Sequence, residues 1–148
     1  ATWLAIGIGL HNFGEGLSIG AALSLGNAAL GSMLLIGFAI HNITEGVAII
    51  APITKQKVTI AMLLGWLCLA GLPAIAGTWI GAFTFAPQWN ALFFGIAAGA
   101  IAQVIVEVSR SIWVMRSTLG DKFIVSNAFA GFAVGILVMY TTAFLIQV

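Results

Sequence analysis

The 148-residue chain is 61% hydrophobic and 6% charged, a balance that excludes a soluble globular domain and indicates a membrane protein. Its formal net charge of +1 leaves no basic cluster, which excludes nucleic acid as a partner. The single cysteine, Cys68, excludes an internal disulfide and a thiolate metal cluster. We interpret it as a small apolar residue within a helix.

Five apolar stretches follow one another, and each is longer than the about 20 residues that a helix needs to cross a hydrocarbon core. Membrane-spanning strands would be shorter and would alternate in polarity. The sequence therefore predicts an all-α fold: a polytopic membrane helical bundle of five transmembrane helices in one domain over residues 1–148. The predicted spans cover residues 2–24, 29–52, 58–84, 90–115 and 123–147.

The first two spans carry the same six-residue pattern, which reads HNFGEG from His11 and HNITEG from His41. Ionisable side chains are costly inside a bilayer and mark ion sites or ion paths there. Because residues i and i+4 share a helix face, His11 lies over Glu15, and the second pattern repeats this arrangement. Both patterns lie about 14–18 Å into their spans at 1.5 Å per residue, so we expect them to meet near the midplane.

Imidazole, carboxylate and amide groups form a ligand set that suits Zn²⁺ and tolerates Fe²⁺ or Mn²⁺. Two ionised glutamates also balance one divalent cation, which would otherwise be costly to dehydrate. The alternative is that each histidine and glutamate form only a buried hydrogen-bonded pair that holds helices together. We predict a metal site made of His11, Asn12, Glu15, His41, Asn42 and Glu45.

The later spans are poorer in polar residues. In the third, Gly71 and Pro73 predict a kink. In the fourth, Gln103 and Glu107 are a possible exit pathway for the ion, whereas the alternative is a local ion pair between Glu107 and Arg110. Glycine pairs at four-residue spacing predict close helix packing, at Gly16/Gly20, Gly77/Gly81, Gly95/Gly99 and Gly131/Gly135.

The five basic residues lie in two connections, between spans two and three and around the link between spans four and five: Lys55, Lys57, Arg110, Arg116 and Lys122. Basic loops stay in the cytoplasm, so we predict a cytoplasmic N-terminus and an extracytoplasmic C-terminus. Trp3, Trp89 and Trp113 lie near span ends, as interfacial anchors do. The chain opens at Ala1 without the regions of a signal peptide, and we expect that sequence precedes it in the complete protein.

The paired patterns resemble the metal-binding helices of the ZIP (Zrt/Irt-like) transporters, in which they are the fourth and fifth of eight helices. The five spans match helices four to eight of that fold in number and spacing. The resemblance implies that His11, Glu15 and Glu45 are primary metal ligands and that His41 faces the same site. It also implies a second metal position at Asn12 and Asn42, a homodimer, and a chain that is the C-terminal part of a longer transporter and lacks its first three helices.

The sequence departs from this family at two further points. Proline often occupies the fourth place of the pattern, where it opens the helix; here Gly14 and Thr44 stand there. Some members carry a carboxylate in the sixth helix, whereas the corresponding stretch from Ala70 to Ala74 has none. These departures bear on the local geometry and on the second metal position.

We expect a multi-pass cell-membrane transporter that moves a divalent cation, most plausibly Zn²⁺, toward the cytoplasm, with Fe²⁺, Mn²⁺ or Cd²⁺ as other cargoes. The alternative is a non-transporting metal-binding or sensor subunit. We do not expect an enzyme, because zinc proteases use H-E-x-x-H and di-metal carboxylate bundles use Glu-x-x-His. Its expected partners are the metal ion, the lipid bilayer, a second copy of the chain and the missing N-terminal helices.

Overall fold

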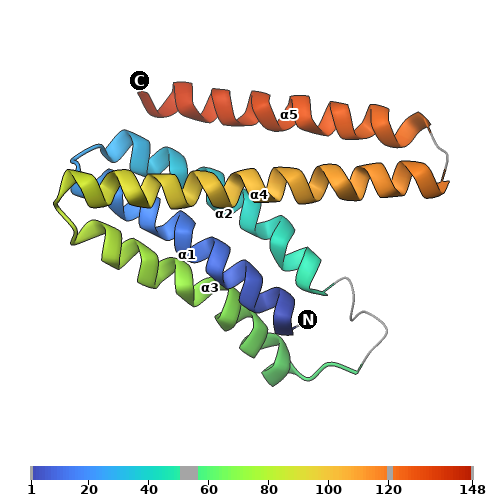
Figure 1. Ribbon diagram of the computed structural model, residues 1–148, viewed down its shortest axis with the longest axis horizontal. Helices are drawn as coiled ribbons and strands as arrows, with labels where there is room; N and C mark the ends of the chain where they lie inside the picture. The colour runs from blue at the N-terminus through green and yellow to red at the C-terminus, as the bar shows by residue number, and fades with distance from the viewer. Residues whose placement is uncertain (1, 51–56, 120–121, 148) are drawn as a thin grey trace. The chain divides into compact units, whose positions relative to one another are not determined.

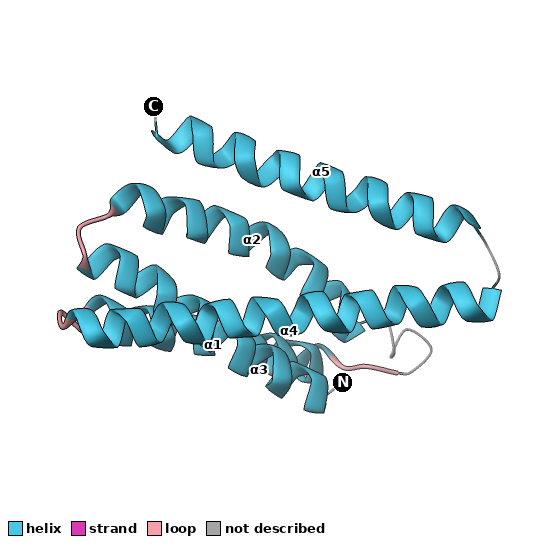
Figure 2. Ribbon diagram, turned by 45° about the horizontal axis from the view of Figure 1, so that its top comes forward, coloured by secondary structure: helices cyan, strands magenta, loops and turns pink. Residues whose placement is uncertain are grey.

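The computed structural model describes residues 2–50, 57–119 and 122–147. These residues form five helices and no strand (Figure 2). The helices are α1 (Thr2–Ser24), α2 (Ala28–Ile50), α3 (Ile60–Ala82), α4 (Pro87–Leu119) and α5 (Lys122–Gln147). The predicted all-α fold is confirmed, and α4 is longer than the predicted span of residues 90–115.

Among the described residues, three helices are long and apolar enough to cross a membrane, as expected of a membrane protein: α2 over Ala28–Val47, α3 over its full length, and α4 over Pro87–Ser117. The apolar part of α5, Val125–Thr141, is shorter. In α1 the polar side chains of His11, Asn12 and Glu15 interrupt the apolar sequence. The residues of α1 that predict a metal site are therefore the same residues that lower its mean hydropathy.

The chain divides into two compact units, residues Ala1–Ala98 and Gly99–Val148. The first contains α1, α2, α3 and the beginning of α4. The second contains the rest of α4 and α5, with Trp113 exposed and the Arg116 guanidinium 5.6 Å from the centre of its ring. The two sequence patterns both lie in the first unit.

Helices α1 and α3 run side by side in the first unit (Figure 1, blue and green) because their glycines let the two backbones touch. A Cβ placed on Gly16 would lie 2.1 Å from the Ala74 carbonyl oxygen, and one on Gly77 would lie 2.2 Å from that of Phe13. Gly20 and Gly81 meet the opposite backbone in the same way. Close packing at these two glycine pairs is thus confirmed, and it is the kind of contact on which helices in membranes depend.

The other two glycine pairs behave differently. A Cβ at Gly95, Gly99, Gly131 or Gly135 would meet nothing within 4 Å among the described residues. The four-residue spacing alone therefore does not identify a packed face.

Helix α3 continues through Pro73. A proline has no N–H group, so the Leu69 carbonyl loses its usual helical donor. This oxygen packs directly on Gly9 of α1, where a Cβ would lie 2.2 Å away. The absence of a side chain at Gly9 thus makes room for the carbonyl that has lost its helical donor to the proline.

Further contacts hold the first unit together at both ends. The Trp66 Nε1 donates to the Thr2 hydroxyl at 3.0 Å, and Trp66 shares a buried cluster with Ala5, Ile49 and Ala70 that brings in the end of α2. At the other end, the Asn90 Nδ2 of α4 donates to the Ser24 hydroxyl at 3.1 Å.

The turn between α1 and α2 is short because its residues suit a sharp reversal. Gly26 has a φ of 71°, a left-handed conformation that glycine adopts without strain. The Asn27 Oδ1 then accepts a hydrogen bond from the Leu30 N–H at 3.0 Å and caps α2. This tight hairpin places the two sequence patterns on neighbouring helices that run in opposite directions.

We expect Gly77→Ala to destabilise the protein by about 1–3 kcal/mol, because the new methyl group meets backbone atoms that cannot rotate away. Gly65→Ala on the same helix is the matched control, since a Cβ there meets nothing within 4 Å. Thermal unfolding in detergent measures both variants. Equal stability of the two would show that the α1–α3 contact contributes little.

Candidate metal centre

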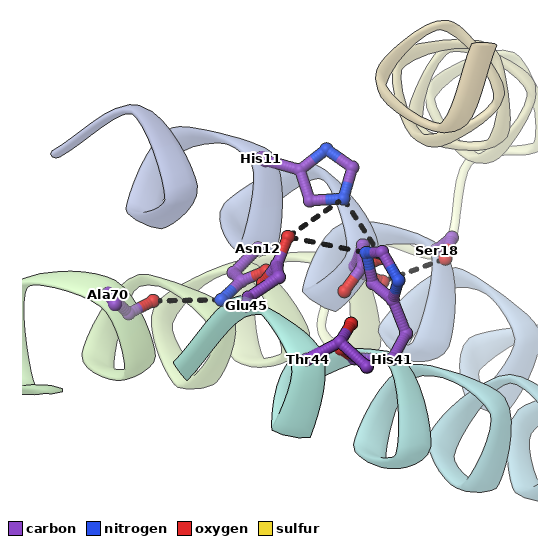
Figure 3. A network of polar contacts seen from close by, with 8 residues as sticks. His11, Asn12, Ser18, His41, Thr44, Glu45 and Ala70 are labelled. Atoms are coloured by element: carbon purple, nitrogen blue, oxygen red, sulfur yellow. Dashed lines mark hydrogen bonds and ion pairs between the residues drawn. The ribbon is translucent and has the colours of Figure 1, made fainter. Parts of the chain in front are cut away.

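Four side chains from the two patterns converge between α1 and α2 (Figure 3). On α1, the Nε2 of His11 lies 3.2 Å from the Oε1 of Glu15. On α2, the corresponding atoms of His41 and Glu45 are 3.3 Å apart. Both pairs have the i, i+4 spacing that brings residues onto one face of a helix.

The two pairs also meet each other across the helix boundary. The His11 Nε2 is 3.7 Å from the Glu45 Oε1, and the His41 Nε2 is 4.0 Å from the Glu15 Oε1. The imidazole rings are tilted by 58°, with their centres 5.6 Å apart. Atoms of His11, His41 and Glu45 all lie within 4.8 Å of one another and could hold a metal ion.

These separations can be compared with those of a tetrahedral zinc site. Ligand atoms that lie about 2.0–2.1 Å from a zinc ion at tetrahedral angles are about 3.3–3.4 Å from one another. The two contacts within a helix already have this spacing. The two contacts between helices are longer, at 3.7 and 4.0 Å, so an ion bound by all four groups would require α2 to approach α1.

The site is set deepest on the α1 side. The Glu15 side chain is 2% exposed, whereas those of His11, Glu45 and His41 are 11%, 12% and 31% exposed. The His11 Nε2 and both Glu15 oxygens make no hydrogen bond in the described part of the chain, although His11 and Glu15 are within ion-pair distance. An arrangement in which buried lone pairs converge without hydrogen bonds favours a cation over a self-sufficient hydrogen-bonded pair.

Four more oxygens that could serve a second position are buried at the same place. They have no hydrogen-bond partner among the described residues and come from both carboxylates and both amides: Glu15 Oε2, Glu45 Oε2, Asn12 Oδ1 and Asn42 Oδ1. Oxygens of these types are ligands for hard and borderline divalent cations. The two asparagines differ, however, because the Asn12 Nδ2 donates to the Ala70 carbonyl of α3 at 3.1 Å.

Hydroxyl groups next to the site bond to the backbone of the candidate ligands. The Thr44 Oγ1 donates to the His41 carbonyl at 2.6 Å, and the Ser18 Oγ donates to the Glu15 carbonyl at 2.7 Å. Such bonds compete with the helical hydrogen bond of the same carbonyl and can bend a helix locally. In the sequence, Thr44 stands out only as a substitute for proline and Ser18 does not stand out, although its position three residues after Glu15 is the available signal.

The residues predicted for the exit pathway lie in the other unit of the chain. Gln103 and Glu107 belong to the second unit, and Gln103 is exposed. The side chain of Glu107 lies outside the described residues, so both interpretations of it stay predictions. Among the basic residues of the connections, Lys57 of the first unit is exposed, whereas Lys55 falls outside the described residues.

Comparison with protein-family models, with curated proteins and with solved structures finds no match to this chain.

We expect Glu15→Gln to raise thermal stability in the absence of metal, because it replaces a buried carboxylate whose oxygens make no hydrogen bond among the described residues with a neutral group of the same shape. The same variant should lose most of the stabilisation that added zinc gives the unsubstituted protein. Thermal unfolding with and without zinc tests both effects.

Glu45→Gln is the comparison. It should lose the stabilisation by zinc to the same extent, but its thermal stability without metal should rise less, because the Glu45 side chain is more exposed. If Glu15→Gln instead destabilised the metal-free protein, the carboxylate would be stabilising the fold through His11 alone.

Proposed function

We propose that this chain is the metal-binding part of a membrane transporter of the ZIP type, which moves a divalent cation toward the cytoplasm, with Zn²⁺ the ion that best suits the imidazole and carboxylate ligands. The observation that carries the proposal is the repeated pattern whose four side chains converge at separations near those of a zinc site. No enzyme activity is proposed, since every polar group of the cluster is used as a ligand and none remains as a base.

The same proposal includes the arrangement in the membrane. All five helices cross the bilayer, with the N-terminus in the cytoplasm and the C-terminus outside, and the basic connections stay on the cytoplasmic side. The apolar spans found in α2, α3 and α4 support this arrangement. The polar interruption of α1 is compatible with it, because ionisable residues within membrane spans face partners, cavities or ions rather than lipid.

A site that binds and releases its cargo needs ligands that are pre-arranged but not closed around the ion. The contacts between α1 and α2 are longer than those within each helix, and the His41 side chain is 31% exposed. We therefore assign α1 as the more buried half of the site and α2 as the half through which the ion exchanges with its surroundings.

We expect the double variant His11→Ala with Glu45→Ala to abolish zinc uptake into vesicles that contain the complete protein. Together the two substitutions remove one ligand from each helix and leave too few for a stable site. Uptake of zinc followed with a fluorescent indicator measures the effect.

The matched control is Leu10→Ala with Val47→Ala, which changes one residue of each of the same two helices at exposed positions. Uptake by the control should equal that of the unsubstituted protein. Uptake by the ligand variant would contradict the assignment, and tight zinc binding without uptake by the unsubstituted protein would favour a sensor subunit.

Zinc binding should weaken as the pH falls from about 7 to about 5, because the histidines must be neutral and the glutamates ionised in order to ligate. Binding at a given pH should accordingly release protons into the buffer. Calorimetry in buffers of different ionisation enthalpy measures this release. Affinity that is the same across this pH range would exclude imidazole ligands.

A further inference from the structure

Asn12 ties the metal-binding turn of α1 to α3. Its Nδ2 donates to the Ala70 carbonyl oxygen at 3.1 Å, and the residue is 3% exposed (Figure 3). Asn12 lies between His11 and Glu15 in the sequence, so this bond holds the turn that carries both candidate ligands of α1. It joins residues that are far apart in the chain.

The bond also determines which end of the amide remains available. An asparagine side chain has a donor end and an acceptor end. Because the Nδ2 donates to the Ala70 carbonyl, this bond fixes which end of the amide faces α3, and the Oδ1 is buried without a hydrogen-bond partner among the described residues. A cation requires the oxygen, so α3 fixes the amide in the orientation that a metal site needs.

The Ala70 carbonyl is held firmly in place. The carbonyls on either side of it in α3, those of Leu69 and Ala74, pack directly against Gly9 and Gly16 of α1. These glycines flank Asn12 by one turn in each direction along α1. The position of the acceptor relative to Asn12 is therefore set by contacts between two backbones, which do not adjust as side chains do.

Asn42 occupies the same place in the second pattern but has no such restraint. Its Oδ1 is buried without a partner, and no hydrogen bond from its amide to another helix occurs in the described ranges. The two asparagines of the repeat therefore have the same chemistry, but only Asn12 is restrained by a hydrogen bond to another helix in the described ranges.

We propose that Asn12 is a positioning residue: through the Ala70 carbonyl it fixes the orientation of the α1 metal-binding turn, and α3 thereby contributes to the site without a carboxylate. This inference rests on the proposed metal binding. It separates the roles of the two asparagines, with Asn42 free to turn toward the ion and Asn12 held by α3.

The same substitution at both asparagines tests the proposal, because the expected effects have opposite signs. In Asn12→Asp, a carboxylate oxygen replaces the donor and faces the Ala70 carbonyl, so two acceptors oppose each other in a buried place. We expect zinc affinity to fall by about 10- to 100-fold, the range found when a residue that orients metal ligands is lost, despite the added negative charge. In Asn42→Asp no carbonyl opposes the new charge, and we expect zinc to bind more tightly.

The measurement is competition for zinc between the purified full chain and a chromophoric chelator, at a pH well above the ordinary pKa of an aspartate carboxyl. If both aspartate variants bind zinc equally well or more tightly than the unsubstituted protein, Asn12 is an ordinary ligand and the inference is wrong. If the unsubstituted protein does not bind zinc, the proposed function fails and the inference with it.

Asn12→Leu tests the same proposal if the aspartate variant does not fold, because it removes the donor without adding a charge. It should weaken the first, tightest zinc equivalent by about 10- to 100-fold, since the turn that holds His11 and Glu15 is no longer fixed. If Asn12→Leu lost only a second, weaker equivalent, Asn12 would be a ligand of that position alone, and the positioning role would be overturned.

Discussion

The direct contact between the backbones of α1 and α3 is the constraint on which the rest of the first unit depends. Gly16 and Gly77 leave no space for even a methyl group between the two helices. At this distance, α3 carbonyl oxygens reach α1, and one of them accepts the amide of Asn12. The glycine contact therefore does more than pack two helices, because it brings a backbone hydrogen-bond acceptor to the turn that carries His11 and Glu15.

Much of the fold follows from features that are visible in the sequence. Apolar stretches of sufficient length predict the helices, and the i, i+4 spacing predicts that each histidine meets the glutamate of its own pattern. The end of α4 was less predictable. Hydropathy places it near residue 115, whereas the helix continues to Leu119, because a helix does not need to end where the sequence becomes charged. Its start at Pro87 follows a different rule, since proline suits the first turn of a helix.

The finer structure of the site could not be predicted, because it depends on atoms that have no signature in the sequence. The acceptor for Asn12 is the backbone carbonyl of Ala70, and a carbonyl is present at every residue. The two asparagines likewise differ because α3 packs against α1, where it meets Asn12. The repeated pattern contains no information about that packing. The glycine spacing shows the same limit, since only two of the four pairs lie against another backbone.

The tight turn at Gly26 bears on the direction of ion movement in the proposed transporter. It makes α1 and α2 antiparallel, and each helix supplies one histidine–glutamate pair, with separations of 3.2 and 3.3 Å. An ion held by the proposed ligands would thus have one imidazole and one carboxylate from each helix. The identity of the ligands then gives the ion no preferred direction, so in the proposed transporter net flow would be set by the ion gradient or by elements outside the cluster.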